Sequence, residues 1–223
     1  MNHFRKLSLL LSLCCGVLWN SSGADAGIII GVQSTSITAG GTGSVDVLIS
    51  SDSNDLLDFA AYEFAITNVG GPVSTLEFTN ATEVGGSPYV FAGDNLGINV
   101  STLTNSQLIA NDATNSGTGV ILNSTFLLAR LGLNHVLGPG QTAAQAGGEQ
   151  FQISLLNSGN TLFQDNTLPV PTTFAFSSTS GLITVSSAAV PEPSTFAAIA
   201  MALGGFGLHR RPKKTNDGGC LKP

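Results

Sequence analysis

Cysteine is scarce in this chain of 223 residues, and none of its three cysteines lies between residues 27 and 189. Cys14 and Cys15 lie near the N-terminus, and Cys220 lies near the C-terminus. The long central segment therefore has no residue that could form a disulfide, a thiolate zinc site or an iron–sulfur site. Its fold must be stabilised by burial of apolar surface and by hydrogen bonds.

Basic residues are also scarce in the central segment. Arg130 is the only Lys or Arg between residues 27 and 189, against eleven Asp and Glu residues, which gives this segment a formal net charge of −10. Nucleic acids and anionic membrane surfaces attract Lys and Arg, so a charge of this sign excludes nucleic acid as a partner. We expect Arg130 to form an ion pair inside the fold.

His135 is the only histidine between residues 27 and 189. Any acid–base or triad mechanism built on histidine would have to use it. No Gly-x-Ser-x-Gly motif and no pair of carboxylates lies near it in the sequence, so we interpret His135 as a turn residue at the rim of the domain. A hydrolase, the alternative, would require a serine and a carboxylate beside His135 in a cleft. We predict no catalytic residue and no cofactor.

The first 26 residues have the three parts of a secretion signal. Arg5 and Lys6 supply the positive start, residues 7–18 form the apolar stretch, and Ala24 and Ala26 occupy the two positions that signal peptidase reads. We predict a signal peptide at 1–26 and a mature chain that begins near Gly27. A lipoprotein signal at Cys14 or Cys15 is the alternative, but the residues before these cysteines fit that pattern badly.

Near the C-terminus, a short uncharged run lies between a proline motif and a basic cluster. Prolines fix the backbone before the run in a non-helical conformation. The run itself, residues 194–208, is shorter than the roughly twenty residues that a membrane-spanning helix needs. The basic cluster begins with Arg210 and Arg211 and favours the cytoplasmic side of a membrane. The proline motif consists of Val190, Pro191, Glu192 and Pro193.

This order of motif, apolar run and basic cluster resembles the PEP-CTERM sorting signal of Gram-negative bacteria. The resemblance implies an exosortase-type membrane enzyme that removes the signal and leaves the preceding domain at the cell surface or in extracellular polymer. We therefore predict a sorting signal with a short transmembrane helix at residues 190–214, followed by a tail at 215–223. An ordinary C-terminal membrane anchor is the alternative.

Residues 27–189 show the pattern of many short strands separated by Gly and Pro. Period-two alternation predicts strands at 44–50, 59–69 and 151–155, with Tyr62 and Phe64 on a buried face. Residues 182–185 supply the last strand, and residues 141–146 a short helical turn. The long apolar segment 120–133 suits a strand buried on both faces, with a helix as the alternative. This spacing of strands predicts an all-β sandwich.

The segments 37–50, 59–67 and 76–79 resemble the start of a cohesin-type domain. They give a strand, a Gly-containing turn, an alternating strand and then a strand with an aromatic residue at its centre. Residues 159–171 and 181–185 resemble the closing hairpin and last strand of that family. The resemblance implies a nine-stranded jelly-roll β-sandwich, an architecture shared with some carbohydrate-binding modules.

Such a domain has candidate residues for two kinds of ligand, Ca²⁺ and a sugar. The loop with Asp52, Asp55 and Asp58 could offer oxygen atoms to Ca²⁺, but it lacks the glycine and the distant glutamate of an EF-hand, so we interpret it as a solvated loop and keep calcium as the alternative. Sugar rings stack on exposed aromatic side chains. We expect Tyr89 and Phe91, in a loop at 83–95, to be the more exposed rings, whereas Tyr62 lies on the core face.

The sequence thus predicts an exported, non-enzymatic β-sandwich module. Signal peptidase and an exosortase-type enzyme are its expected processing partners, and the C-terminal helix is expected to anchor it transiently in the membrane. At the cell surface or in the extracellular matrix it would interact with surface proteins. A carbohydrate-binding protein that binds extracellular polysaccharide is the alternative.

Overall fold

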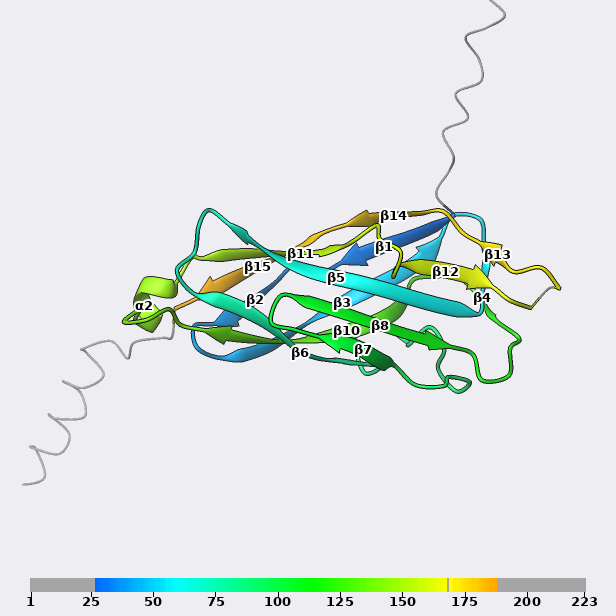
Figure 1. Cartoon of the computed structure of the whole chain (residues 1–223), viewed down its shortest axis with the longest axis horizontal. Coiled ribbons are helices and arrows are strands. Elements are labelled where there is room, and N and C mark those ends of the chain that lie inside the picture. The colour runs from blue at the N-terminus through cyan, green and yellow to red at the C-terminus, as the bar shows by residue number, and fades with distance from the viewer. Residues whose placement is uncertain (1–26, 168, 188–223) are drawn as a thin grey trace, which may run out of the picture. The chain divides into compact units, whose positions relative to one another are not determined.

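The computed structural model describes residues 27–167 and 169–187 (Figure 1). These residues form two packed β-sheets with one short helix at one end. The prediction of an all-β sandwich is confirmed. Within the described ranges, no helix is long and apolar enough to cross a membrane. The predicted signal peptide, sorting motif and C-terminal helix lie outside the described residues.

The first sheet has five strands in the order β14-β1-β3-β10-β6. Its neighbouring strands are antiparallel, except that β14 runs parallel to β1. The strands are β1 (Ile28–Val32), β3 (Thr42–Ser51), β6 (Thr75–Thr82), β10 (Phe126–Val136) and β14 (Phe176–Thr179).

The second sheet has eight strands arranged around β5 (Phe59–Val69). β5 pairs with β8 on one side and with β11 and β12 on the other. A separate ladder joins β4 (Leu56–Leu57) to β9 (Val120–Ile121). The remaining strands of the sheet are β2 (Thr35–Thr38), β7 (Asn99–Leu103), β8 (Gln107–Ala113), β11 (Gln150–Leu155), β12 (Leu162–Asp165), β13 (Thr172–Thr173) and β15 (Gly181–Ser186).

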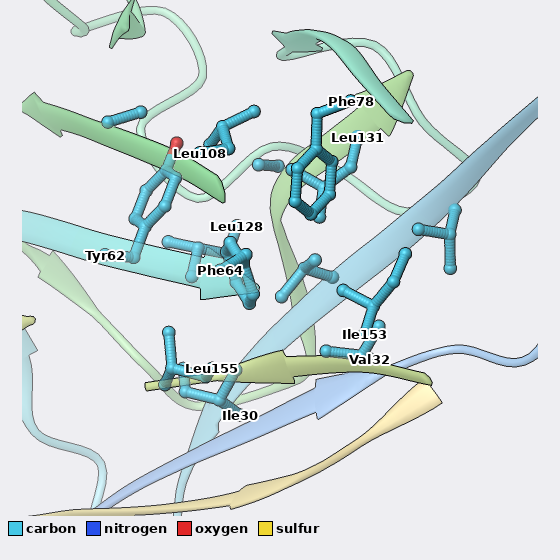
Figure 2. Packing of buried hydrophobic residues seen from close by; sticks show 14 of the residues in the cluster. Ile30, Val32, Tyr62, Phe64, Phe78, Leu108, Leu128, Leu131, Ile153 and Leu155 are labelled. Carbon is cyan, nitrogen blue, oxygen red and sulfur yellow. The ribbon is translucent and has the colours of Figure 1, made fainter. Parts of the chain in front are cut away.

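The inner faces of the two sheets form a continuous apolar core. Figure 2 shows side chains from both sheets in this core, among them Tyr62 and Phe64 of β5 and Leu131 of β10. The predicted burial of Tyr62 and Phe64 is confirmed. Each large apolar side chain removed from water contributes about 1.5–3 kcal/mol. Burial on this scale stabilises a domain that has no cysteine to form a disulfide.

The apolar segment 120–133 is extended and not helical, but it forms two separate strands, β9 and most of β10, instead of one strand buried on both faces, and Ile121 is 55% exposed. A shift of register between Leu127 and Ala129 lets both of these residues and Leu128 be buried. Regular alternation returns from Leu131 onward. The predicted helical turn is also confirmed as α2 (Ala143–Ala146), with the Thr142 side chain as its N-cap.

The first and last strands cross from one sheet to the other side by side. β1 and β14 are parallel neighbours in the first sheet, and their continuations β2 and β15 are parallel neighbours in the second. At the crossing, a Cβ atom added to Gly181 would lie 2.3 Å from the carbonyl oxygen of Gln33. Atoms this close overlap, so the crossing requires glycine at position 181 for space.

The sandwich has two ends, which we call the α2 end and the loop end. The α2 end consists of residues 38–42, 70–74 and 136–149, and the loop end of residues 51–58, 94–95, 112–118 and 165–167. β5 runs from one to the other, because Phe59 pairs with Ala113 and Val69 pairs with Gln150. Figure 1 shows α2 at one end of the strands and β4 with β12 at the other.

Candidate functional site

Ser74, His135 and Glu149 meet at the α2 end of the sandwich. Ser74 directly precedes β6, His135 lies on β10, and Glu149 directly precedes β11. Ser74 and His135 are each 1% exposed. The prediction of a turn position for His135 is wrong, because the alternation of β10 from Leu131 onward carries its ring into the sandwich. The sequence offered no signal for this cluster, since 61 residues separate Ser74 from His135.

The hydrogen bonds of the cluster define where its protons lie. The backbone N–H of Gly40 donates to Nδ1 of His135 at 2.9 Å, so the neutral ring carries its proton on Nε2. Nε2 lies 2.8 Å from Oγ of Ser74 and donates to it, and the Ser74 hydroxyl donates in turn to Oε2 of Glu149. A nucleophilic serine needs the opposite arrangement, in which Nε2 accepts the serine proton.

Glu149 is held as a carboxylate although it is partly buried. Burial raises its pKa, but hydrogen bonds from Ser74, Val73 and Gln141 outweigh this and lower the pKa below its ordinary value. The N–H of Val73 lies 2.9 Å and Nε2 of Gln141 lies 2.7 Å from Oε1. The carboxylate thus connects three segments of the α2 end and has no oxygen atom free of hydrogen bonds.

Two shallow hollows flank Glu149. One has a volume of about 350 Å³ and is lined by the glycine-rich segments 69–72 and 147–150. The other, about 320 Å³, is lined by Val73, Glu149 and the 139–145 region. Glu149 is the only charged residue in either lining, and its oxygens are occupied. Neither hollow exposes the Ser74 hydroxyl, which is buried.

His135 makes the stability of the domain sensitive to acid. Burial lowers its pKa below the ordinary 6.5, and the nearby charge of Glu149 only partly opposes this. In the unfolded chain His135 gains a proton as the pH falls through 6.5, whereas the folded state resists it, so the folded state loses stability below that pH. We expect the melting temperature to fall between about pH 7 and pH 5, where histidine titrates.

The control for this expectation is His135→Gln, compared with its own value at neutral pH. The variant lacks the titrating ring, so its melting temperature should change much less over the same interval, whatever its stability at pH 7. Equal falls in the two proteins would assign the acid sensitivity to other groups and would contradict the role given to His135.

The three predicted calcium residues lie at the loop end, where Asp52 and Asp55 share the Ser53 hydroxyl as a hydrogen-bond donor and Asp58 has a different partner. Oδ2 of Asp55 accepts hydrogen bonds from Ser51 at 2.8 Å and Ser53 at 3.0 Å. Oδ1 of Asp58 accepts from the Thr114 hydroxyl. Asp52 is exposed. In residues 27–167 and 169–187, no group of three or more His, Cys, Asp or Glu residues could hold a metal ion.

The expectation that Tyr89 and Phe91 are exposed rings is wrong, because they are 7% and 0% exposed. Their segment is not a free loop. The N–H of Val90 bonds the carbonyl of Leu127, and Tyr89 forms a β-bridge to Leu127. The Tyr89 hydroxyl donates to Asp112 at 2.5 Å. These rings therefore offer no surface on which a sugar could stack.

Arg130 forms the expected ion pair inside the fold, with Asp46. Its Nε lies 2.6 Å from Oδ1 and its Nη2 lies 3.1 Å from Oδ2 of Asp46. The two residues are direct cross-strand neighbours on β10 and β3. The hydrogen bond from Arg130 lowers the pKa of Asp46, burial opposes this, and the N–H of Gly86 adds to the lowering. Arg130 is thus paired inside the fold, as expected.

The outer face of the eight-stranded sheet is the surface that sequence reasoning missed. Small or amide side chains from β5, β8 and β11 make up most of it, with the half-buried Ile109 among them, and we call it the neutral face. The alternation of these residues with buried apolar ones was the available signal. The neutral face consists of Ala61, Ala65, Thr67, Gln107, Asn111, Gln152 and Ser154, all exposed or half-buried.

Glu63 is the one carboxylate on this side of β5, and it is covered. It is 4% exposed, and it accepts hydrogen bonds from Ser158 at 2.5 Å, Asn160 at 2.9 Å and Gln107 at 2.5 Å. These donors, led by Ser158, lower its pKa. The charge is thus screened by neutral donors, and the surrounding surface is polar without exposed charge.

The described domain is similar to solved cohesin domains. The seventh ScaB type I cohesin from Pseudobacteroides cellulosolvens superposes with a TM-score of 0.54 and 13% sequence identity, over 74% of this chain and 96% of that chain. The sixth cohesin from Acetivibrio cellulolyticus scaffoldin B, solved in complex with a Cel5 dockerin mutant, gives 0.51 and 16%, over 71% and 99%. The domain has a cohesin-like fold.

A cohesin described as non-cellulosomal also matches. The non-cellulosomal cohesin from the hyperthermophilic archaeon Archaeoglobus fulgidus gives a TM-score of 0.50 and 13% identity, over 78% of this chain and 98% of that chain. The predicted resemblance is therefore confirmed for the fold of the cohesin-like domain. A comparison with curated proteins found no match.

The PEP-CTERM protein-sorting motif matches residues 189–211. This confirms the second predicted resemblance, and the range includes the predicted motif at 190–193 with Arg210 and Arg211. These residues lie outside the described part of the chain, as do Ala24 and Ala26. The functions assigned to them individually stay predictions.

Proposed function

We propose that this chain is an exported surface or extracellular-matrix protein whose cohesin-like domain is a non-catalytic module for binding another protein. The observation that carries the proposal is that a cohesin-like sandwich and a sorting motif follow one another in the same chain. A sandwich that covers 96–99% of the length of two solved cohesins is followed directly by a sorting motif at residues 189–211. Signal peptidase and an exosortase-type enzyme would process the two ends.

Two features of the α2 end support the absence of catalysis. The proton on Nε2 of His135 points toward Ser74, and Ser74 is buried. The resulting cluster stabilises the fold by joining β10 to the segments before β6 and β11. It has neither the base nor the access that acyl transfer requires.

The neutral face is the proposed binding surface. The cores of protein interfaces are depleted in charged residues, and this face combines small side chains with amides that can donate and accept hydrogen bonds. The acidic residues of the domain lie elsewhere or, like Glu63, are covered. A soluble glycan is the alternative ligand, since amides also bond sugar hydroxyls, but the buried Tyr89 and Phe91 remove the rings on which stacking was expected.

Export and processing can be tested by mass. The proposal expects the protein isolated from the cell surface or matrix to be smaller than the encoded chain by residues 1–26 and by a segment that begins near the motif at 190–193. Intact mass spectrometry measures both ends in one experiment. Full-length protein in the cytosol would contradict the proposal.

Binding can be tested by placing one charge on the neutral face. Thr67→Arg should weaken capture of a partner from the secreted protein fraction by about tenfold or more, because an unpaired buried charge in an interface costs several times the 1.4 kcal/mol that tenfold represents. Thr79→Arg, an exposed threonine on β6 of the other sheet, is the matched control and should bind normally. Equal capture by both variants would exclude the neutral face, and capture of polysaccharide alone would favour the alternative ligand.

A further inference from the structure

The polypeptide leaves the domain at the α2 end. The carbonyl of Ser186 accepts a hydrogen bond from Ala39 at 2.9 Å, and Val185 exchanges two backbone hydrogen bonds with Gly148 and Glu149, at 2.8 and 2.9 Å. The last strand is therefore fixed to this end up to its final residue. The matched sorting motif begins at residue 189, so hardly any chain separates the two.

The charges of the domain are distributed unevenly between its ends. The loop end carries five aspartates in its defining segments at 51–58, 94–95 and 112–118, and a sixth at 165. The α2 end carries one carboxylate, that of Glu149, which internal hydrogen bonds occupy. Its loops are otherwise uncharged and rich in Gly and Pro, and they expose Val73 and Val136. With six carboxylates against one, the loop end would be repelled by anionic lipid headgroups much more strongly than the α2 end, although Asp58, Asp112 and Asp165 are buried.

The short segment between the domain and the uncharged run limits how far the domain can lie from a membrane that holds this run. Six residues, 188–193, separate the described domain from the uncharged run that begins at Ser194, and a connection of this length spans at most about 25 Å. β5 alone has 11 residues, and at about 3.3 Å per residue it places the loop end about 36 Å from the α2 end. With the uncharged run in a bilayer, the α2 end is the part of the domain held nearest to the lipid.

We propose that the α2 end is the surface that lies against the lipid headgroups before the sorting signal is removed, and that the acidic loop end points away from the membrane. This inference rests on the proposed sorting function. It assigns the loops at 70–74 and 136–149, whose one charged residue is Glu149, to a lipid surface, and it leaves the neutral face, on the side of the sandwich, free for a protein partner.

Site-specific fluorescence quenching tests the orientation. The chain that remains after the expected removal of residues 1–26, with Cys220 replaced by serine, receives one new cysteine, either Ala144→Cys on α2 or Asn166→Cys at the loop end. Both positions are exposed, and each variant is labelled with the same fluorophore. The proteins are reconstituted into vesicles of phosphatidylcholine and phosphatidylglycerol that carry a nitroxide on the headgroup. The label at position 144 should be quenched at least about twofold more, because the ends are about 36 Å apart.

Vesicle flotation, run in parallel, separates the two ways in which the idea could fail. Protein that floats with the vesicles but shows equal quenching at both labels, or stronger quenching at position 166, would overturn the orientation and leave the sorting function intact. Protein that does not float would overturn both, since no membrane-inserted state would then exist.

Discussion

Replacing Gly181 with alanine should destabilise the cohesin-like domain by about 3 kcal/mol, the upper end of the usual cost of overpacking, and lower its melting temperature by about 10 °C. The added Cβ would lie 2.3 Å from the Gln33 carbonyl oxygen and 2.7 Å from a methyl carbon of Val32. The oxygen belongs to the backbone and cannot rotate away. The first and last strands would have to separate where they cross between the sheets, and Gly181→Val should prevent folding.

Gly31→Ala is the matched control, because Gly31 lies in β1 just before the same crossing. A Cβ there would meet only the Thr179 hydroxyl, at 3.7 Å, which is an ordinary contact. Thermal unfolding should therefore show little change for this variant. If Gly181→Ala unfolds at the same temperature as Gly31→Ala, the close crossing of the two strands is not a constraint on the fold.

The fold was predictable because the strands carry their own pattern. Tyr62 and Phe64 alternate with Ala61, Glu63 and Ala65, and the burial of β5 follows that alternation except at Glu63, which its polar partners cover. The pattern failed at two places, one irregular strand and one segment outside the strands. The shift of register near Leu127 hides three consecutive residues, and Tyr89 is buried because it pairs with β10 instead of remaining in a loop.

The contacts at the α2 end could not be predicted from sequence. Ser74 and His135 are 61 positions apart, and Ser74 and Glu149 are 75 apart. Nothing local to any of the three residues indicates the others, since their meeting depends on the antiparallel pairing of β6 with β10 and on the loop before β11. The scarcity of basic residues was more informative. Because Arg130 is the single base among eleven acids, the sequence predicted an internal ion pair for it, and the structure has that pair.

Arg130→Met should destabilise the domain by about 2 kcal/mol at neutral pH. Breaking a fully buried ion pair costs about 3–5 kcal/mol and breaking an exposed one about 0–1 kcal/mol. This pair lies between the two, since the Asp46 side chain is 8% exposed and that of Arg130 is 37% exposed. Methionine keeps the apolar length of the side chain, so the loss reports chiefly on the Asp46 carboxylate, which retains a hydrogen bond from the N–H of Gly86 at 2.8 Å.

The pH dependence of the lost stability distinguishes an unpaired Asp46 carboxylate from a packing defect as its cause. In the native pair the pKa of Asp46 is lowered from 3.8, so the stabilisation it provides is complete above pH 3.8 and is lost as the pH falls through the lowered value. In Arg130→Met burial is no longer opposed by a cation, so the pKa of Asp46 rises, and protonation of Asp46 relieves the cost at a higher pH.

The difference in unfolding free energy between native and variant should therefore shrink as the pH approaches 3.8. Asp46→Asn combined with Arg130→Met should recover part of the lost stability at neutral pH. A difference that stays constant with pH, or a double variant no more stable than Arg130→Met, would assign the effect to packing and remove Asp46 from the explanation.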